Sequence, residues 1–227
     1  TNIFRREWWR YYQETPITYG CIQSWDTAYK RGAEADYSVC TTWGLTKTAY
    51  VLLDVWRGQV EFPELKRHVQ ALYAKYKPYA VIVEDKASGQ SLIQELQRET
   101  AMPIFPTKVD SDKITRANAV TPMIEAGRVR LPAEAPWLAD FVEEMTAFPS
   151  GEHDDIVDSV AHALNYLRTS AIGPPEERVL KPLADIMIDA IERPPEPTYT
   201  DLVWGQAKSD AFWEGEHQAR EMIYDIR

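Results

Sequence analysis

Four acidic residues stand at three separate places in the sequence where carboxylates could act together on one substrate. Asp26 and Glu84 each end an apolar run, and Asp154 and Asp155 precede a helical pattern. Carboxylates directed at one point repel each other, so they must share a proton or hold a cation. Oxygen ligands favour Mg²⁺ or Mn²⁺ over zinc. Two such ions roughly 4 Å apart suit the hydrolysis of a phosphodiester by an activated water molecule.

The two apolar runs predict strands that bring Asp26 and Glu84 together. Residues 80–83 form a short continuous apolar run, typical of a strand buried on both faces of a parallel sheet. In the run at 19–25, alternation places Ser24 and Asp26 on the same face. If the strands are parallel neighbours, both acids lie at the carboxyl edge, where open α/β sheets bind ligands.

The third acidic position begins a predicted helix, 154–167. Its buried stripe is expected to comprise Ile156, Val160, Ala163, Leu164 and Leu167. Asp155 lies at the edge of this stripe and Asp154 lies farther round the helix, so we expect Asp155 to reach the sheet, with Asp154 beside it. Structural alternatives stay open: Asp154 as a helix cap, Asp155 and Asp158 as partners of the helix dipole, and Asp26 as the start of a turn.

The remaining patterns predict an α/β fold with three segments. Further strands are expected at 37–43, 49–56, 104–105 and 128–131, with a turn at 44–47, and further helices at 63–76, 90–99, up to 126, and 137–148. Residues 17–169 form the expected domain. Residues 1–16, rich in aromatics and arginines, are expected to pack on its side or to act as a linker. Residues 170–227, with six of the 15 prolines between 173 and 197, are expected to form a partly helical C-terminal appendage.

Composition limits the classes of protein without choosing a partner. The chain has two cysteines, no bilayer-length apolar run and no leader, so we expect neither a membrane partner nor secretion. The net charge is −10, but residues 170–227 contribute 12 acids against 6 bases. Bulk charge therefore neither supports nor excludes DNA. The candidate phosphate contacts, with solvated surface charge as their alternative role, are Lys30, Arg31, Lys86, Lys108, Lys113 and Arg116.

Three motifs in order resemble the nuclease domain of the large terminase subunit of tailed bacteriophages. They are SWDTA at 24–28, VEDKASG at 83–89 and HDDIVDS at 153–159, and FRREWWRYY at 4–12 resembles the stretch that leads into that domain. The resemblance implies a ribonuclease H-like fold, with a mixed central sheet flanked by helices. It also implies a Mg²⁺- or Mn²⁺-dependent endonuclease that cuts concatemeric viral DNA during packaging. By motif, Asp26, Glu84 and Asp155 would be catalytic metal ligands, with Asp154 as a ligand of the second ion.

The same resemblance implies partners and a location. The partners would be double-stranded DNA, an ATPase domain of the same polypeptide, and the portal and small terminase subunit, at the procapsid in the host cytoplasm. The sequence contains no GxxxxGK[ST] phosphate loop, so we expect no ATPase activity in this chain. Two alternatives stay open: a junction resolvase or transposase on the same fold, and a non-catalytic module that docks a motor or portal.

Overall fold

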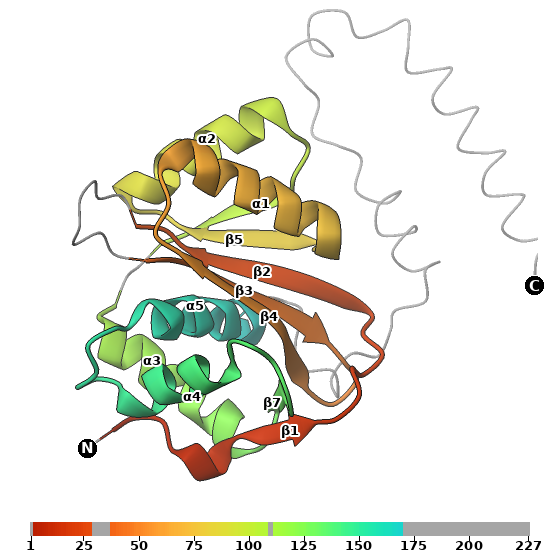
Figure 1. Cartoon of the computed structure of the whole chain (residues 1–227), viewed down its shortest axis with the longest axis vertical. Coiled ribbons are helices and arrows are strands. Elements are labelled where there is room, and N and C mark those ends of the chain that lie inside the picture. The colour runs from red at the N-terminus through yellow and green to blue at the C-terminus, as the bar shows by residue number, and fades with distance from the viewer. Residues whose placement is uncertain (1, 29–36, 109–110, 170–227) are drawn as a thin grey trace, which may run out of the picture. The chain divides into compact units, whose positions relative to one another are not determined.

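A seven-stranded mixed sheet lies at the centre of the domain and confirms the expected α/β fold (Figure 1). The computed structural model describes residues 2–28, 37–108 and 111–169. The loop with Lys30 and Arg31 and the appendage 170–227 lie outside the described residues. The strand order is β1-β7-β4-β3-β2-β5-β6. Among the described residues, no helix has the length and apolar character needed to cross a membrane.

The elements alternate along the chain largely as the sequence predicts. The strands are β1 Arg10–Tyr12, β2 Gly20–Asp26, β3 Ser38–Leu45, β4 Tyr50–Gly58, β5 Ala80–Glu84, β6 Ile104–Thr107 and β7 Val129–Pro132. The helices are the short 3-10 turn η1 Arg6–Trp8, α1 Phe62–Tyr76, α2 Ala87–Glu99, α3 Lys113–Glu125, α4 Leu138–Ala147 and α5 Asp155–Thr169. Only β3 is antiparallel to its neighbours β2 and β4; the other adjacent strands are parallel.

Helices cover both faces of the sheet, α1 and α2 on one and α3, α4 and α5 on the other (Figure 1). Because side chains alternate along a strand, β2 contributes to two separate cores. Trp25 packs with Leu65 of α1 on the first face. Ile22 belongs to the cluster that contains Phe141 of α4 and Ile156 of α5 on the second face. Both cores exclude water, which is the main favourable contribution to folding.

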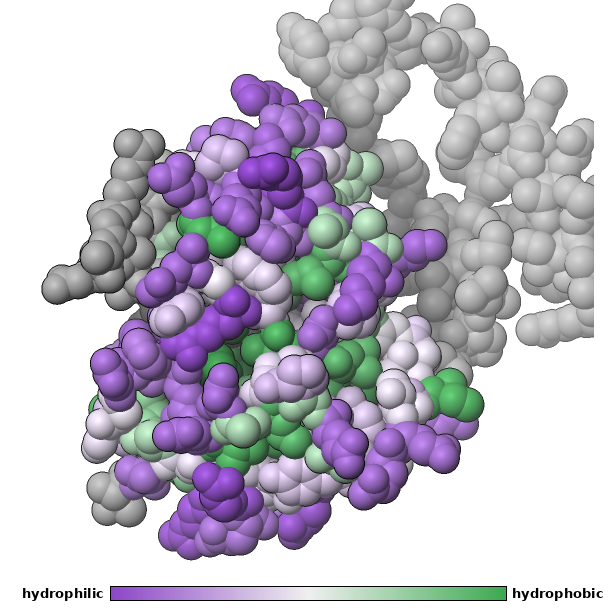
Figure 2. All heavy atoms as spheres, viewed as in Figure 1, coloured by the Kyte–Doolittle hydropathy of each residue, from purple (hydrophilic) through white to green (hydrophobic). Residues whose placement is uncertain are grey.

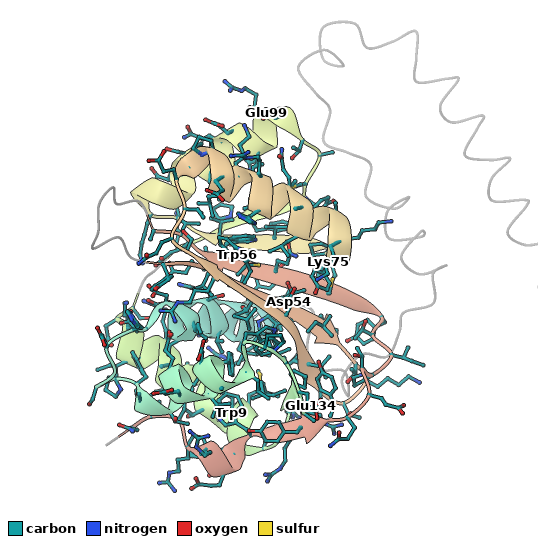
Figure 3. All side chains as sticks on the ribbon, viewed as in Figure 1. Trp9, Asp54, Trp56, Lys75, Glu99 and Glu134 are labelled. Atoms are coloured by element: carbon teal, nitrogen blue, oxygen red, sulfur yellow. The ribbon has the colours of Figure 1, made fainter. Side chains whose placement is uncertain are left out.

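Polar and aromatic contacts hold α1 on the sheet. Lys75 lies above Asp54 of β4, with 3.3 Å between Nζ and Oδ2 (Figure 3), and the hydroxyl of Tyr76 donates to the same carboxylate at 2.7 Å. Farther along the helix, the ring of His68 lies 4.5 Å from that of Trp56. The outward surface of α1 and α2 is mostly hydrophilic (Figure 2), as expected for helices with one buried face.

The aromatic N-terminal segment packs into the second core. Phe4 and Trp9 are buried there, at 1% and 3% exposure, and β1 extends the sheet by pairing with β7. The hydroxyl of Tyr12 donates to the carbonyl of Leu52 in β4 at 2.7 Å. These contacts join the segment to the sheet by side chains and backbone together.

Small shifts separate the predicted elements from the observed ones. The turn expected at 44–47 lies at 46–49, because β3 continues to Leu45 and Thr46 closes the turn by accepting from the amide of Ala49 at 3.0 Å. Gly127, at φ +71°, follows α3 as predicted, since a left-handed residue at this position favours glycine. Helix α2 begins at Ala87 rather than at residue 90.

The early start of α2 makes the turn after β5 very tight. Only Asp85 and Lys86 separate the last residue of β5, Glu84, from the first residue of α2. Gly89 therefore packs directly beneath the strand end. A Cβ atom on Gly89 would collide with the carbonyl oxygen of Glu84 and lie 3.2 Å from Cγ1 of Val83. The backbone that carries Glu84 thus requires glycine at this position.

We predict that Gly89→Ala destabilises the domain by about 1–3 kcal/mol, because the strand end or the helix must move to admit the methyl group. Urea denaturation measures this change in the free energy of unfolding. Gln90→Ala is the matched control: its side chain is exposed, and the change should stay within about 0.5 kcal/mol. Equal stability of Gly89→Ala and wild type would contradict the close approach.

Candidate active site

Two neighbouring strands bring Asp26 and Glu84 to the same edge of the sheet. Strands β2 and β5 are parallel, with Ser24 opposite Ile82 and Trp25 opposite Val83, as the sequence predicted. Each acid ends its strand and shares the face that α5 covers. Both are buried, with exposures of 7% for Asp26 and 1% for Glu84. The nearby Glu84 side chain contributes to the raised pKa of Asp26.

Helix α5 adds a third buried carboxylate. The Ser159 hydroxyl donates to the carbonyl of Ser24 in β2 at 2.9 Å and lies 2.8 Å from the Thr41 hydroxyl in β3. These bonds fix the helix across the centre of the sheet. The preceding residue, Asp158, is 2% exposed, and its charge acts directly on Asp26. Acids from β2, β5 and α5 therefore meet at one edge.

Burial makes negative charge costly in this cluster. Burial raises the pKa of Asp26 well above its ordinary value; Lys86 opposes this shift, while Asp158 and Glu84 add to it. Burial also acts to raise the pKa of Glu84, but the adjacent side chains of His162 and Lys86 outweigh it and lower that pKa to about 2. The pKa values of these two neighbouring carboxyl groups therefore shift in opposite directions, so that Asp26 favours the protonated form and Glu84 the ionised form.

Basic side chains surround the acids and supply positive charge. The ammonium of Lys86 pairs with Oε2 of Glu84 and lies 4.0 Å from Oδ1 of Asp26. His162, 3% exposed, places Nε2 3.6 Å from the other oxygen of Glu84. A lysine and a histidine therefore face Glu84 from different elements, the β5–α2 turn and α5.

A second group of cations holds Asp158. The ammonium of Lys113 lies 2.7 Å from Oδ2 of Asp158 and 2.8 Å from Oδ1 of Asp154, and Nη2 of Arg116 lies 2.9 Å from Oδ1 of Asp158. The buried Arg116 guanidinium thus orients Asp158. The side chains of Lys86 and Lys113 remain nearly half exposed, at 48% and 42%, and can still reach a phosphate.

The structure places Asp155 differently from the other acids. Asp155 lies in the first turn of α5, and its Oδ2 is 3.5 Å from Nη2 of Arg57 in β4. Asp154, with a side chain that is 40% exposed, precedes the helix, and its carboxylate contacts the cluster through Lys113. Of the expected ligands, Asp26 and Glu84 are brought together, while Asp158 occupies the inner position expected for Asp155. Lys108 is exposed on the loop before α3.

The sequence analysis missed the inward roles of Asp158 and His162 because it assumed one buried stripe on α5. The helix is buried on nearly all sides, and residues 156–164 are all buried. A signal was present: Asp158 and His162 are four residues apart, so they share a helix face. Ionisable residues at that spacing inside an otherwise apolar helix indicate an inward polar face.

The carboxylates have the chemistry of a divalent-cation site. Within the described part of the chain, no group of three or more acidic, histidine or cysteine side chains yet surrounds one point as a complete ligand set. Both oxygens of Glu84 and Oδ2 of Asp158 are nevertheless buried without a well-directed hydrogen bond, although each forms an ion pair. Buried carboxylate oxygens in this state fit a hard cation such as Mg²⁺ or Mn²⁺.

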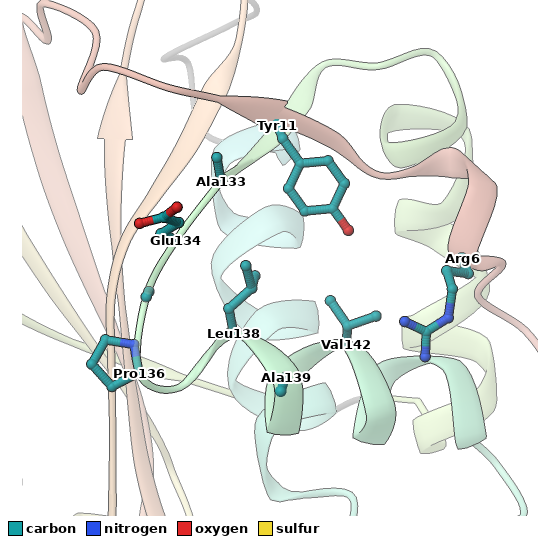
Figure 4. Close-up of a pocket in the computed structure, with 9 residues that line it drawn as sticks. Arg6, Tyr11, Ala133, Glu134, Pro136, Leu138, Ala139 and Val142 are labelled. Carbon is teal, nitrogen blue, oxygen red and sulfur yellow. The ribbon is translucent and has the colours of Figure 1, made fainter.

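A surface cavity of about 640 Å³ lies elsewhere, between the N-terminal segment and α4 (Figure 4). Its wall includes Tyr11, Leu138 and Val142, with Arg6 and Glu134 at its sides. None of the clustered acids lines it, and a single carboxylate beside apolar side chains does not offer the same chemistry. The acid cluster is therefore the better candidate for an active site.

Comparison with solved structures supports the fold around this cluster. The large terminase of a thermophilic bacteriophage is similar with a TM-score of 0.55 and 14% identity; the match covers 73% of this chain and 44% of that protein. The large terminase nuclease of the thermophilic phage G20c with bound magnesium gives 0.53 and 19%, covering 72% and 96%. The nuclease domain of Thermus phage P74-26 gives 0.51 and 19%, covering 74% and 95%.

A search of curated proteins found no match.

The chain spans less than half the length of the first of these terminases, but it spans nearly all of the two separate nuclease domains. Among protein-family models, the one described as the terminase RNaseH-like domain matches residues 23–167, which include β5 and most of β2 and α5. Because this match covers well over half of the sequence, the chain belongs to the terminase RNaseH-like domain family.

Proposed function

We propose that this domain is a metal-dependent endonuclease that cuts double-stranded viral DNA during genome packaging. The observation that carries the proposal is the meeting of Asp26, Glu84 and Asp158 at one edge of the sheet, with buried carboxylate oxygens that lack directed hydrogen bonds. The similar G20c nuclease has been solved with magnesium, zinc and cobalt, which supports a divalent cation here.

In this proposal, Asp26, Glu84 and Asp158 hold the cation, and two Mg²⁺ or Mn²⁺ ions are the expected complement. Asp154 and Asp155, at the start of α5, are further candidates for the second ion. Divalent ions neutralise developing phosphate charge and lower the pKa of a water molecule. The protein's own contribution is to orient the acids: His162 holds Glu84, and Arg116 holds Asp158.

DNA contacts fall to the basic side chains near the site. Lys86 and Lys113 are exposed enough to exchange a carboxylate partner for a DNA phosphate. Lys108, Lys30 and Arg31 are further candidates. Phosphate contacts carry no sequence information, so we propose that cutting has no base readout of its own.

We further propose that the domain works as part of a larger packaging machine. An ATPase domain of the same polypeptide, the portal and the small terminase subunit are its proposed partners. Cutting would occur at the procapsid in the host cytoplasm. The match to only 44% of a thermophilic phage's large terminase supports a longer parent protein.

We predict that Asp26→Asn and Glu84→Gln each abolish Mn²⁺-dependent nicking of plasmid DNA, because each replaces a buried carboxyl ligand with an amide. Agarose gels of supercoiled plasmid measure the nicking rate, and circular dichroism checks folding. Glu125→Gln, an exposed acid at the end of α3, is the control and should cut like wild type. Retained cutting in a folded variant would remove that residue from the mechanism.

A second comparison separates the two acids of α5. We expect Asp158→Asn to weaken Mn²⁺ binding more than about 100-fold, beyond the usual effect of losing an outer-shell partner, because Asp158 is the inward carboxylate. Asp155→Asn should retain binding within about tenfold, since the Asp155 carboxylate forms an ion pair with Arg57 of β4. Isothermal titration calorimetry measures both affinities. The reverse order would assign the third ligand position to Asp155.

The raised pKa of Asp26 predicts an unusual dependence of stability on pH. A carboxyl group with a raised folded-state pKa stabilises the fold below its unfolded pKa of about 3.9, and this contribution is lost as pH rises through the folded pKa. In EDTA, Asp26→Asn should therefore gain stability relative to wild type as pH rises. Glu84 has the opposite sign, but its contribution is lost only as pH falls toward about 2.

Urea unfolding of both proteins at several pH values from about 5 to 8 measures this difference. Saturating Mn²⁺ should reverse this stability difference, because only the wild-type protein has the Asp26 carboxylate to bind the cation. A difference that stays constant over this range in EDTA would show that Asp26 is already ionised without penalty.

A further inference from the structure

A glutamate outside the acid cluster satisfies the first turn of α5. Glu144 of α4 is 7% exposed, and its Oε1 accepts a hydrogen bond from the backbone amide of Ile156 at 2.6 Å. The first amides of a helix have no partner within the helix, and a residue next to the helix usually caps them. Here the acceptor comes from another helix. Its negative charge also suits the positive end of the helix dipole.

Arg57 joins this cap to the sheet. Its Nη1 lies 3.3 Å from Oε2 of Glu144, its Nη2 lies 3.5 Å from Oδ2 of Asp155, and its guanidinium lies 3.8 Å from the centre of the Tyr37 ring. The strand register places Arg57 opposite Val39, which is itself opposite Asp26. Arg57 therefore connects α4 and α5 to the row of the sheet in which Asp26 lies.

We propose that Glu144 is a positioning residue that, together with Arg57, fixes the first turn of α5 and thereby sets Asp158 beside Asp26 and Glu84. This inference rests on the proposed function. Asp158 lies two residues after Ile156, and its amide makes the first-turn bond to the carbonyl of Asp154 at 3.0 Å. Rotation or fraying of this turn would move Asp158 before it affected the rest of the helix.

The chemistry of the contact argues against a purely stabilising role. A buried ion pair often contributes little to stability compared with apolar residues of similar volume, because both charges lose their hydration. Burial raises the pKa of Glu144, while the Ile156 amide and Arg57 partly offset it. A directed acceptor at this position instead specifies where the helix begins and how it is rotated.

The test compares variants of the full chain by Mn²⁺ titration calorimetry and by hydrogen exchange of the α5 first-turn amides. Glu144→Ala removes the acceptor, and Glu144→Gln keeps an acceptor oxygen without the charge. Val69→Ala is a control for general destabilisation, because Val69 is fully buried in the core on the opposite face of the sheet. The three variants separate capping from charge and from loss of stability.

Glu144→Ala should weaken Mn²⁺ binding by about 10–100-fold and abolish exchange protection of the first turn, as expected for a residue that orients a ligand. Glu144→Gln should recover most of both, and Val69→Ala should bind Mn²⁺ like wild type despite lower stability. Wild-type affinity in Glu144→Ala would overturn the proposal. Equal loss in Val69→Ala, or in Glu144→Gln, would also overturn it.

If Glu144→Ala does not fold, Glu144→Met provides a second test, because it keeps most of the buried volume but removes the acceptor of the Ile156 amide. Weakened Mn²⁺ affinity in this variant supports the positioning role, and wild-type affinity contradicts it. Failure of the proposed function is distinguishable: wild type itself would then bind no Mn²⁺. The exchange protection of the first turn would still report whether Glu144 caps α5.

Discussion

Carboxylates buried at the edge of the sheet repel each other, and the surrounding structure exists to offset that repulsion. Asp26 lies close enough to Glu84 and Asp158 for both to raise its pKa, and all three side chains have little access to water. An apolar environment makes such charges expensive unless they are paired. Lysines, an arginine and a histidine from three different elements provide the pairing. Without a function, this concentration of opposed charges would be a costly way to build a core.

The sheet and the first two acids were predictable because their determinants are local. A continuous apolar run followed by an acid predicts a buried strand with a carboxylate at its end, and alternation predicts which face Asp26 takes. Adjacent parallel strands then bring Asp26 and Glu84 together. Tertiary context is needed only to make β2 and β5 neighbours.

The choice between Asp155 and Asp158 has one weak local indication, the four-residue spacing of Asp158 and His162. It depends on the rotation of α5, which is fixed by Ser159 against β2 and β3 and by Glu144 of α4 at the first turn. These partners lie far away in the sequence, so periodicity alone cannot reveal them. Predicting the buried face of a helix from its apolar stripe also requires that the opposite face be exposed to solvent, and α5 has almost no exposed face. Likewise, nothing in the sequence indicated that Arg116 would be buried against Asp158 rather than exposed to a phosphate.

The lysines that pair with the acid cluster bear on the proposed binding of DNA by a chain with net negative charge. Lys86 and Lys113 neutralise the carboxylates that a divalent ion would also neutralise, so the ion and the two ammonium groups compete for the same oxygens. When a divalent ion binds these carboxylates, the ammonium groups of Lys86 and Lys113 lose their partners. They can then turn toward solvent and pair with a DNA phosphate. Binding of the cation and binding of DNA are then thermodynamically linked, and each must strengthen the other. A net charge of −10 is therefore compatible with a DNA enzyme, because the relevant charge is local and depends on the cation.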